Sequence, residues 1–244
     1  VFSALPSNAR VQTGVPAAGA PNLIASILAR RQSDAALVVR SSSTVEDATT
    51  SSMAGRFTSV LDVRGWEAFR SAVDRVVVAV PPGWEARVRS LLDPRCDVVV
   101  GGDTRRASTL LALEAVGDDA AVVVCHDAAR PLAPPSLVDA VVEALDGVDG
   151  VVPGFPVADT LKRVEGDLVI GTQPRDGLVA VQTPQAFRAA ALRDAHARTS
   201  VEVTDDAMAL ELAGYRIRVI PGDPMAFKVT TADDLDRARR AIGG

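Results

Sequence analysis

Short apolar runs alternate with amphipathic segments along most of the chain from residue 74 onward. The apolar runs are rich in valine and predict buried strands at 74–80, 96–102, 120–127 and 150–157. The segments between them carry apolar residues at helical spacing and predict helices at 83–93, 104–116 and 136–147. Continuously apolar strands that alternate with helices are typical of a parallel sheet covered on both faces. The pattern therefore predicts an α/β fold with three layers and a mainly parallel sheet.

The pattern changes between residues 158 and 182, where two β-like runs flank turn residues and the helical period disappears. We expect this segment to be an arm that projects from the sheet. Regular alternation then resumes and predicts a helix at 204–214, a strand at 215–222 and a closing helix at 231–242. Hydroxyl side chains stand where three of the helices begin, and we expect Thr104, Ser136 and Thr204 to cap them.

The first 73 residues are less regular. They contain one helix-like segment at 22–31, one strand-like run at 35–40 and a stretch rich in Ser and Thr at 41–63. The composition shifts near residue 74. We therefore predict an atypical N-terminal segment, 1–73, foreign to the rest or partly disordered, and an α/β domain, 74–244.

Composition narrows the classes of function. Hydrophobic residues make up 48% of the 244 residues, enough for a sizeable core, and no apolar run is long enough to span a membrane. The net charge of −5 argues against a nucleic-acid partner but allows small phosphorylated ligands, which need only a local positive pocket. The two cysteines, Cys96 and Cys125, fit no metal-binding pattern, and the N-terminus does not resemble a signal peptide. These features favour a cytoplasmic protein.

Four clusters of polar residues follow predicted strands or the arm. They comprise 101–108, 126–131, Arg175 with the threonine of 182–185, and Lys228 at a predicted strand end within 227–235. In an open α/β sheet, ligands bind beyond the carboxyl ends of the strands. Glycines at such a turn allow close backbone approach, and free N–H groups there can bind an anion. The order of the clusters along one sheet predicts a shared site.

Each cluster also has a structural interpretation. The two glycines at 101–102 could form an ordinary tight turn, and Asp127 and Arg130 could pair with each other. His126 could cap a strand or satisfy a hydrogen bond in the core, and we expect His196 to be a solvated helix residue. Lys228 taken alone is an ordinary surface lysine, and the acidic run at 204–207 could be no more than a helix cap.

Taken together, the clusters favour nucleotidyl transfer. An aspartate can hold Mg²⁺ against triphosphate oxygens, while arginine and lysine position an attacking phosphate and neutralise developing charge. The chain has no Ser-His-Asp arrangement, no HExxH motif and no Walker A lysine motif, so covalent acyl transfer, zinc proteolysis and P-loop chemistry are disfavoured.

Residues 74–244 resemble the 2-C-methyl-D-erythritol 4-phosphate cytidylyltransferase family. The resemblance rests on "GGDTRRAS", "VVVCHDAARP", "LVAVQTPQAF", "TDDA" and "GDPMAFKVTTADDL", which occur in the family's order. It implies a Rossmann-like fold and a reaction in which CTP and methylerythritol 4-phosphate give a CDP-alcohol and pyrophosphate with Mg²⁺ in isoprenoid precursor synthesis. It also implies a homodimer formed through the arm.

The resemblance assigns roles to individual residues. The nucleotide-binding group comprises Gly101, Gly102, Arg105, Ser108, Asp127 and Ala128, with Asp127 as the metal ligand. The substrate-binding group comprises Arg130, Thr160, Arg175, Thr183 and Thr204, some acting across the dimer interface. Arg175, Lys228 and Asp127 form the catalytic group, in which Arg175 and Lys228 position the phosphate for in-line attack. Many members carry an asparagine where this chain has Ala226.

The N-terminal segment departs from the family pattern. The family opens with a loop of the form A-A-G-x-G-x-R, whose basic residues wrap the triphosphate, whereas the Ala-Ala-Gly within 15–24 lacks them. Residues 38–69 instead resemble the nucleotide-binding domain of phosphoenolpyruvate synthase and pyruvate phosphate dikinase, which would place Arg40 and 51–55 near ATP phosphates; a disordered polar loop at 41–55 is the structural alternative. We therefore expect a weakened cytidylyltransferase, and keep a non-catalytic nucleotide-binding dimer and a phosphotransferase fragment as alternatives.

Overall fold

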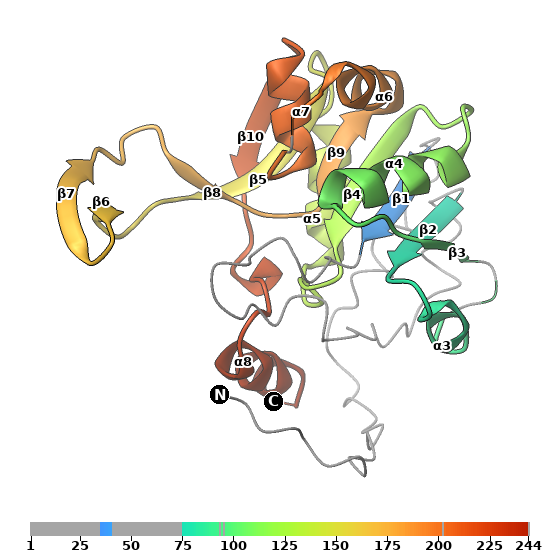
Figure 1. Ribbon diagram of the computed structural model, residues 1–244, viewed down its shortest axis with the longest axis horizontal. Coiled ribbons are helices and arrows are strands. Elements are labelled where there is room, and N and C mark those ends of the chain that lie inside the picture. The colour runs from blue at the N-terminus through green and yellow to red at the C-terminus, as the bar shows by residue number, and fades with distance from the viewer. Residues whose placement is uncertain (1–34, 41–74, 93, 95, 202, 244) are drawn as a thin grey trace.

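A mainly parallel sheet of eight strands lies at the centre of the computed structural model, which describes residues 35–40, 75–92, 94, 96–201 and 203–243 (Figure 1). Seven strands run in the order β10-β5-β9-β4-β1-β2-β3, and β8 pairs with β5. The strands are β1 (Ala35–Arg40), β2 (Arg75–Val80), β3 (Asp97–Val100), β4 (Val122–Asp127), β5 (Gly150–Pro156), β8 (Val179–Val181), β9 (Gln185–Arg188) and β10 (Ile217–Pro221). Only β8 and β9 run antiparallel to their neighbours, so the predicted fold class is confirmed.

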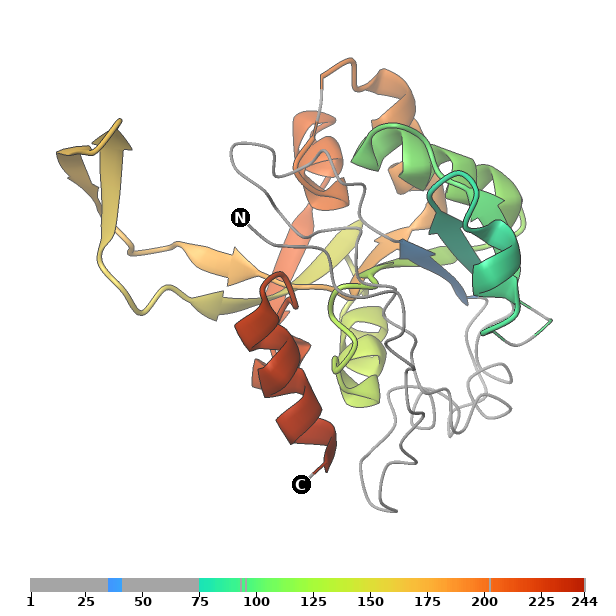
Figure 2. The same ribbon diagram turned by 60° about the horizontal axis from the view of Figure 1, so that its bottom comes forward.

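Helices cover both faces of the sheet (Figure 2). They are α3 (Glu85–Arg89), α4 (Arg105–Val116), α5 (Pro135–Glu143), α6 (Ala189–Arg198), α7 (Asp206–Leu212) and α8 (Ala232–Gly243), with a short 3₁₀ helix, η2 (Pro224–Ala226). Neighbouring strand residues supply opposite cores, because successive side chains alternate across a sheet. Val123 packs in the core beneath α4, α6 and α7, whereas Val124 packs with Val138 and Val141 of α5. No helix in the described ranges is long and apolar enough to cross a membrane.

Strand β1 comes from the N-terminal segment and lies between β4 and β2. The resulting order β3-β2-β1-β4 is that of one half of a doubly wound nucleotide-binding sheet, in which the first strand is central. Residues 35–40, which the sequence predicts as a strand, therefore occupy the position of a first strand. The division of the chain near residue 73 stays a prediction, although β1 before it and β2 after it pair in the same sheet.

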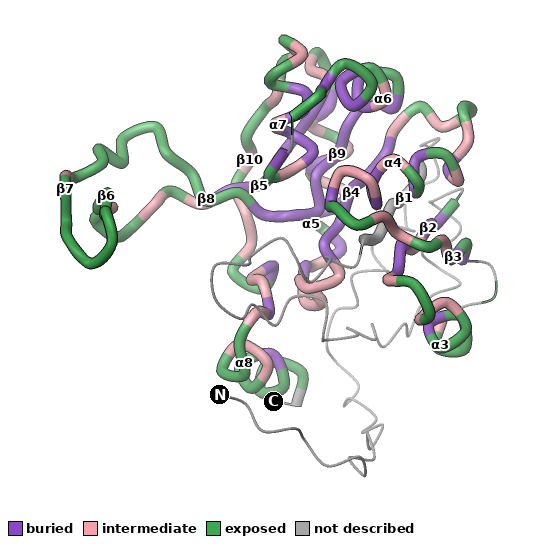
Figure 3. The backbone as a smooth tube through the Cα atoms, in the orientation of Figure 1, coloured by how far each residue is buried: buried purple, intermediate pink, exposed green. Residues whose placement is uncertain are grey.

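The arm projects from the carboxyl end of β5 (Figure 1). Its outer part is a two-stranded antiparallel sheet of β6 (Leu161–Glu165) and β7 (Leu168–Gln173). Its apolar side chains are largely exposed, with Leu168 68% exposed and Val169 62% exposed, and the exposed arm contrasts with the buried central strands in Figure 3.

Several local predictions are wrong. Helix α5 begins at Pro135, so Ser136 lies inside it instead of capping it. Helix α7 is capped by Asp205, whose side chain accepts a hydrogen bond from Met208 N–H, and not by Thr204. Lys228 lies between η2 and α8 and does not end a strand. The predicted cap of α4 is confirmed, because the Thr104 hydroxyl accepts from Ala107 N–H at 3.1 Å.

Candidate active site

The carboxyl ends of the parallel strands bring the candidate residues to one edge of the sheet. Strand β3 ends directly before Gly101, and β4 ends at Asp127. In the neighbouring strand β1, Arg40 is the register partner of Asp127. Two clusters and one residue from the N-terminal segment therefore lie along the edge where an open α/β sheet binds its ligands.

Asp127 lies between two cations at this edge. Its carboxylate is 3.7 Å from the Lys228 ammonium and 4.0 Å from Arg130 Nε. Burial lowers the pKa of Arg130, and Asp127 opposes that shift. Both ion pairs are loose compared with a charge-assisted hydrogen bond of about 2.8 Å. The structure thus places two cations and one carboxylate together at the end of β4.

A tight turn carries Asp127 and Arg130. Arg130 N–H donates to Asp127 C=O at 2.9 Å, and the Arg130 guanidinium donates to the carbonyl of Ala226 at 2.7 Å. Val229 N–H donates to Ala129 C=O at 2.7 Å, which ties the segment that carries Lys228 to the same turn. The structure therefore brings together three of the predicted residues from two distant parts of the chain. Ala226, fully buried, contributes a carbonyl here and no polar side chain.

The loop before α4 needs both of its glycines. A Cβ atom on Gly102 would lie 2.4 Å from the Cβ of Ala107, and one on Gly101 would lie 2.8 Å from Ser108 Oγ. Ser108 Oγ in turn lies 3.2 Å from the Gly102 carbonyl and 3.0 Å from the Thr104 carbonyl. The glycines thus let the first turn of α4 pack against its own loop, and their nucleotide-binding role stays a prediction.

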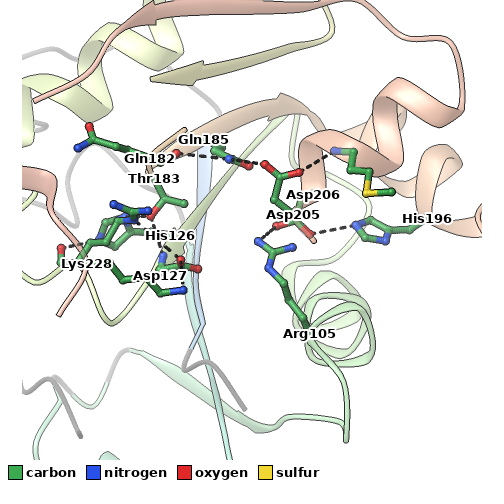
Figure 4. Close-up of polar contacts among 12 residues, drawn as sticks. Arg105, His126, Asp127, Gln182, Thr183, Gln185, His196, Asp205, Asp206 and Lys228 are labelled. Carbon is green, nitrogen blue, oxygen red and sulfur yellow. Dashed lines mark hydrogen bonds and ion pairs between the residues drawn. The ribbon is translucent and has the colours of Figure 1, made fainter. Parts of the chain in front are cut away.

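Arg105 takes part in a buried network that the sequence did not reveal (Figure 4). Its Nη2 atom lies 2.8 Å from Asp206 Oδ2, and His196 Nε2 lies 3.2 Å from Asp206 Oδ1. Burial opposes the charge on Arg105, but Asp206 and Asp127 outweigh it and raise the pKa of Arg105. His196 is fully buried, so its prediction as a solvated residue is wrong. Asp206, on α7, thus joins the start of α4 to α6.

The loop that returns from the arm is tied to the edge of the site by side-chain amides and a hydroxyl. Thr183 Oγ1 accepts from Asp127 N–H at 3.0 Å. The Gln182 side chain makes two hydrogen bonds with the backbone of Asp223, and Gln185 Nε2 donates to Asp205 Oδ2 at 3.1 Å. Both glutamines lie within the "LVAVQTPQAF" motif, but the sequence assigned no role to either of them. Their amides can pair with backbone groups of either kind, and this makes them suitable for holding irregular loops.

Three predicted substrate residues lie apart from this cluster. Arg175 is exposed between β7 and β8, and its guanidinium donates to the carbonyl of Ala158. Thr160 is exposed just before β6. Thr204 is exposed, with its hydroxyl 3.6 Å from the sulfur of Met208. Ala128 is half-buried in the turn after Asp127. The predicted roles of these residues stay predictions.

The described residues could bind Mg²⁺ only through a site that has few protein ligands. They contain no group of three or more His, Cys, Asp or Glu side chains arranged to hold a metal ion. Mg²⁺, however, commonly takes one or two protein carboxylates and completes its octahedron with waters and substrate phosphates. Asp127, a carboxylate at the end of β4, could supply one such ligand.

The sheet order, the glycine loop and the charged edge define an α/β protein of the nucleotide-binding, nucleotidyltransferase class. The family model of 2-C-methyl-D-erythritol 4-phosphate cytidylyltransferase matches residues 56–243. Curated members from Frankia casuarinae and Rhodococcus opacus are each 50% identical to the chain, over 71% and 70% of its length. The chain belongs to this family.

The relatives extend beyond the matched region. The chain spans 66% of the Frankia protein and 76% of the Rhodococcus protein. A crystal structure of the family member from Thermus thermophilus is 32% identical, with a TM-score of 0.66, 85% of this chain covered and 98% of that one. A second family model, the AMP/ATP-binding domain of pyruvate phosphate dikinase, matches residues 21–80. Strand β1 lies within this second match and outside the first.

Proposed function

We propose that the protein transfers a cytidylyl group from CTP to 2-C-methyl-D-erythritol 4-phosphate and releases pyrophosphate. The observation that carries the proposal is the cluster of Asp127, Lys228 and Arg130 at the carboxyl edge of a doubly wound sheet, beside a glycine loop. The proposal is supported by membership of the family. In such a reaction the substrate phosphate oxygen forms a bond to the α-phosphorus, and pyrophosphate leaves with the electrons of the broken P–O bond.

The basic residues, the glycine loop and the carboxylate have separate roles in this proposal. Lys228 and Arg130 hold the attacking phosphate, and closer contacts with the phosphate oxygens offset the loss of their loose contacts with Asp127. Gly101, Gly102 and Ser108 shape the loop that faces the nucleotide base, and Arg105 holds that loop in place through Asp206. Asp127 is the residue that would hold Mg²⁺, which would neutralise charge on the triphosphate.

We further propose that the reaction is slow compared with that of relatives. The basic loop of the family pattern is absent from residues 15–24, which lie outside the described residues. Removing one preorganised electrostatic group typically costs about 10²–10³ in turnover. Strand β1 nevertheless occupies the first-strand position and ends at Arg40 beside Asp127 in register, so one basic residue still stands at this edge.

The arm suggests how the remaining predicted residues take part. Among the described residues, the strands of the outer arm pair with each other alone, and four of their apolar residues are more than half exposed: Val164, Leu168, Val169 and Ile170. We propose that this apolar surface packs on a second copy of the chain, so that Arg175 and Thr160 reach the site of the partner. Analytical ultracentrifugation should show a dimer that Ile170→Lys converts to a monomer; a wild-type monomer at micromolar concentration would contradict the dimer.

Product identification tests the proposed function. The protein incubated with CTP, methylerythritol 4-phosphate and Mg²⁺ should yield a CDP-alcohol by mass spectrometry, whereas omission of the sugar phosphate should yield none. Binding of both ligands without product would favour a non-catalytic nucleotide-binding dimer. Phosphoryl transfer from ATP that is lost on Arg40→Ala, without CTP binding, would favour the phosphotransferase alternative. Because CTP is a cytoplasmic metabolite and both cysteines are buried, we propose a cytoplasmic location.

A further inference from the structure

The imidazole of His126 links both ends of the charged turn to the loop that follows the arm. His126 is 4% exposed, and its Nδ1 atom lies 3.1 Å from Thr183 Oγ1 (Figure 4). Its Nε2 atom lies 3.2 Å from the Arg130 carbonyl oxygen. Thr183 Oγ1 also accepts from Asp127 N–H at 3.0 Å. The four residues thus form one continuous chain of hydrogen bonds.

The Arg130 carbonyl fixes the direction of its own bond, and the directions of the other bonds follow if the ring is neutral. A carbonyl oxygen can only accept, so His126 Nε2 must carry a proton and donate to Arg130. In a neutral imidazole the other nitrogen then accepts, so the Thr183 hydroxyl donates its proton to Nδ1. His126 is 4% exposed, and burial of this kind disfavours a charged imidazole.

This chain of hydrogen bonds, which we call the brace, joins Asp127, Thr183, His126 and Arg130 and stabilises the turn that carries the charges of the site. Asp127 and Arg130 are the two ends of that turn, and their main-chain groups are the two ends of the hydrogen-bond chain. We propose that His126 and Thr183 are positioning residues that set where Asp127 and Arg130 stand for cytidylyl transfer. This inference rests on the proposed function for its kinetic consequence, and on the hydrogen-bond geometry alone for its structural one.

The direction of the bonds also limits what Thr183 can do. Thr183 is only 5% exposed, and the single proton of its hydroxyl is already donated to His126. A phosphate oxygen needs a donor, and the hydroxyl has no second proton to offer. Thr183 therefore acts on the substrate phosphate through Asp127 and Arg130, and not as a direct donor to it.

Substitutions can remove one half of the brace at a time. In His126→Asn the amide stands near the position of Nδ1 and can still pair with Thr183, but the bond to Arg130 is lost. In His126→Gln the amide reaches toward the position of Nε2 and can still donate to Arg130, but the bond to Thr183 is lost. Thr183→Val removes the hydroxyl at almost constant volume. A misplacement of about 1 Å can cost roughly 10²-fold in rate, so we expect each variant to lose about 10- to 100-fold in kcat/KM.

Thr199 provides a matched control. Thr199 is 7% exposed, and its hydroxyl donates to the carbonyl of Ala195 at 2.7 Å at the C-terminal end of α6. Thr199→Val should therefore lower the free energy of unfolding as Thr183→Val does, yet leave kcat/KM for both substrates unchanged. Thr183→Ser keeps a hydroxyl and should lose less kcat/KM than Thr183→Val. Unfolding midpoints measured on the same samples separate loss of folded protein from loss of rate.

Nitrogen NMR of the wild-type ring gives a readout that does not depend on turnover. We expect a proton on Nε2 and none on Nδ1 of His126, and faster hydrogen exchange of the Asp127 amide in Thr183→Val than in Thr199→Val. A proton on Nδ1, or equal exchange in the two variants, would overturn the brace. Wild-type kcat/KM in both Thr183→Val and His126→Gln would overturn its kinetic role. If the wild type forms no CDP-alcohol, the proposed function fails and the NMR result still decides the brace.

Discussion

Replacement of Asp206 by asparagine tests whether the buried network that links α4, α6 and α7 stabilises the fold. Asp206 is fully buried, and its carboxylate pairs with Arg105 at 2.8 Å and with His196 at 3.2 Å. Asp206→Asn keeps the shape of the side chain but leaves the guanidinium of Arg105, itself 5% exposed, without its nearest negative charge. Removing one partner of a buried ion pair typically costs about 3–5 kcal/mol. We expect a loss of that size in the free energy of unfolding.

The double variant Arg105→Met/Asp206→Asn separates charge burial from packing. Once the guanidinium is gone, no uncompensated charge remains, so the double variant should be more stable than Asp206→Asn alone. Asp236→Asn is the matched surface control, because the Arg239–Asp236 pair is more than half exposed on both sides. Its expected cost is below about 0.5 kcal/mol.

Urea denaturation at about pH 7.5, followed by circular dichroism and extrapolated linearly to water, provides the assay. A loss of less than about 1 kcal/mol in the free energy of unfolding for Asp206→Asn would refute the expected penalty, because breaking a buried, desolvated ion pair costs more than that. If the stability losses of the two single variants add in the double variant, the penalty is refuted as well, because additivity would mean that the charges of Arg105 and Asp206 do not interact.

Three further predictions concern the edge of the sheet and the last helix. Arg40→Ala should weaken the affinity for CTP about 10- to 100-fold in calorimetry and leave the affinity for CMP unchanged. Arg40 ends β1 beside Asp127 in register, and one charge-assisted bond contributes about 1.5–3 kcal/mol. Equal effects on both nucleotides would exclude a role at the outer phosphates. Gly102→Ala should lower CTP affinity about tenfold, since the new Cβ forces the start of α4 to move; unchanged affinity would contradict the close packing. Hydrogen bonds led by that from Thr230 N–H lower the pKa of Asp234 below 3.8, so its stabilising effect is present above that value and lost as the pH falls through the folded-state pKa. The difference in unfolding free energy between wild type and Asp234→Asn should therefore vanish in acid, and a difference that persists there would contradict the assignment.

The central strands could be predicted because burial on both faces leaves a plain mark in the sequence. Strand β4 carries three successive valines, and its end was recognisable as the point where Asp127 appears. Strand β9 was missed. Only Ala186 and Phe187 are apolar among its four residues, and its position between β4 and β5 depends on antiparallel pairing with strands far away in the chain.

The candidate site was predicted in outline but not in its supporting contacts. Asp127 and Lys228 were found from their places in the motifs, although Lys228 follows a 3₁₀ helix and not a strand. His196 was misjudged because charged residues lie two positions away on either side, at Asp194 and Arg198, whereas its partner Asp206 lies on another helix. Likewise, nothing in the spacing of His126 and Thr183 shows that they touch. Contacts of this kind depend on how distant segments pack.

The rate of pyrophosphate release with CTP, methylerythritol 4-phosphate and Mg²⁺ tests cytidylyl transfer by this chain most directly. We predict release that requires both substrates, that is at least about a hundredfold slower than for the Rhodococcus opacus relative, and that Lys228→Ala abolishes. No release by the wild type, or release that is independent of the sugar phosphate or unaffected by Lys228→Ala, would contradict it.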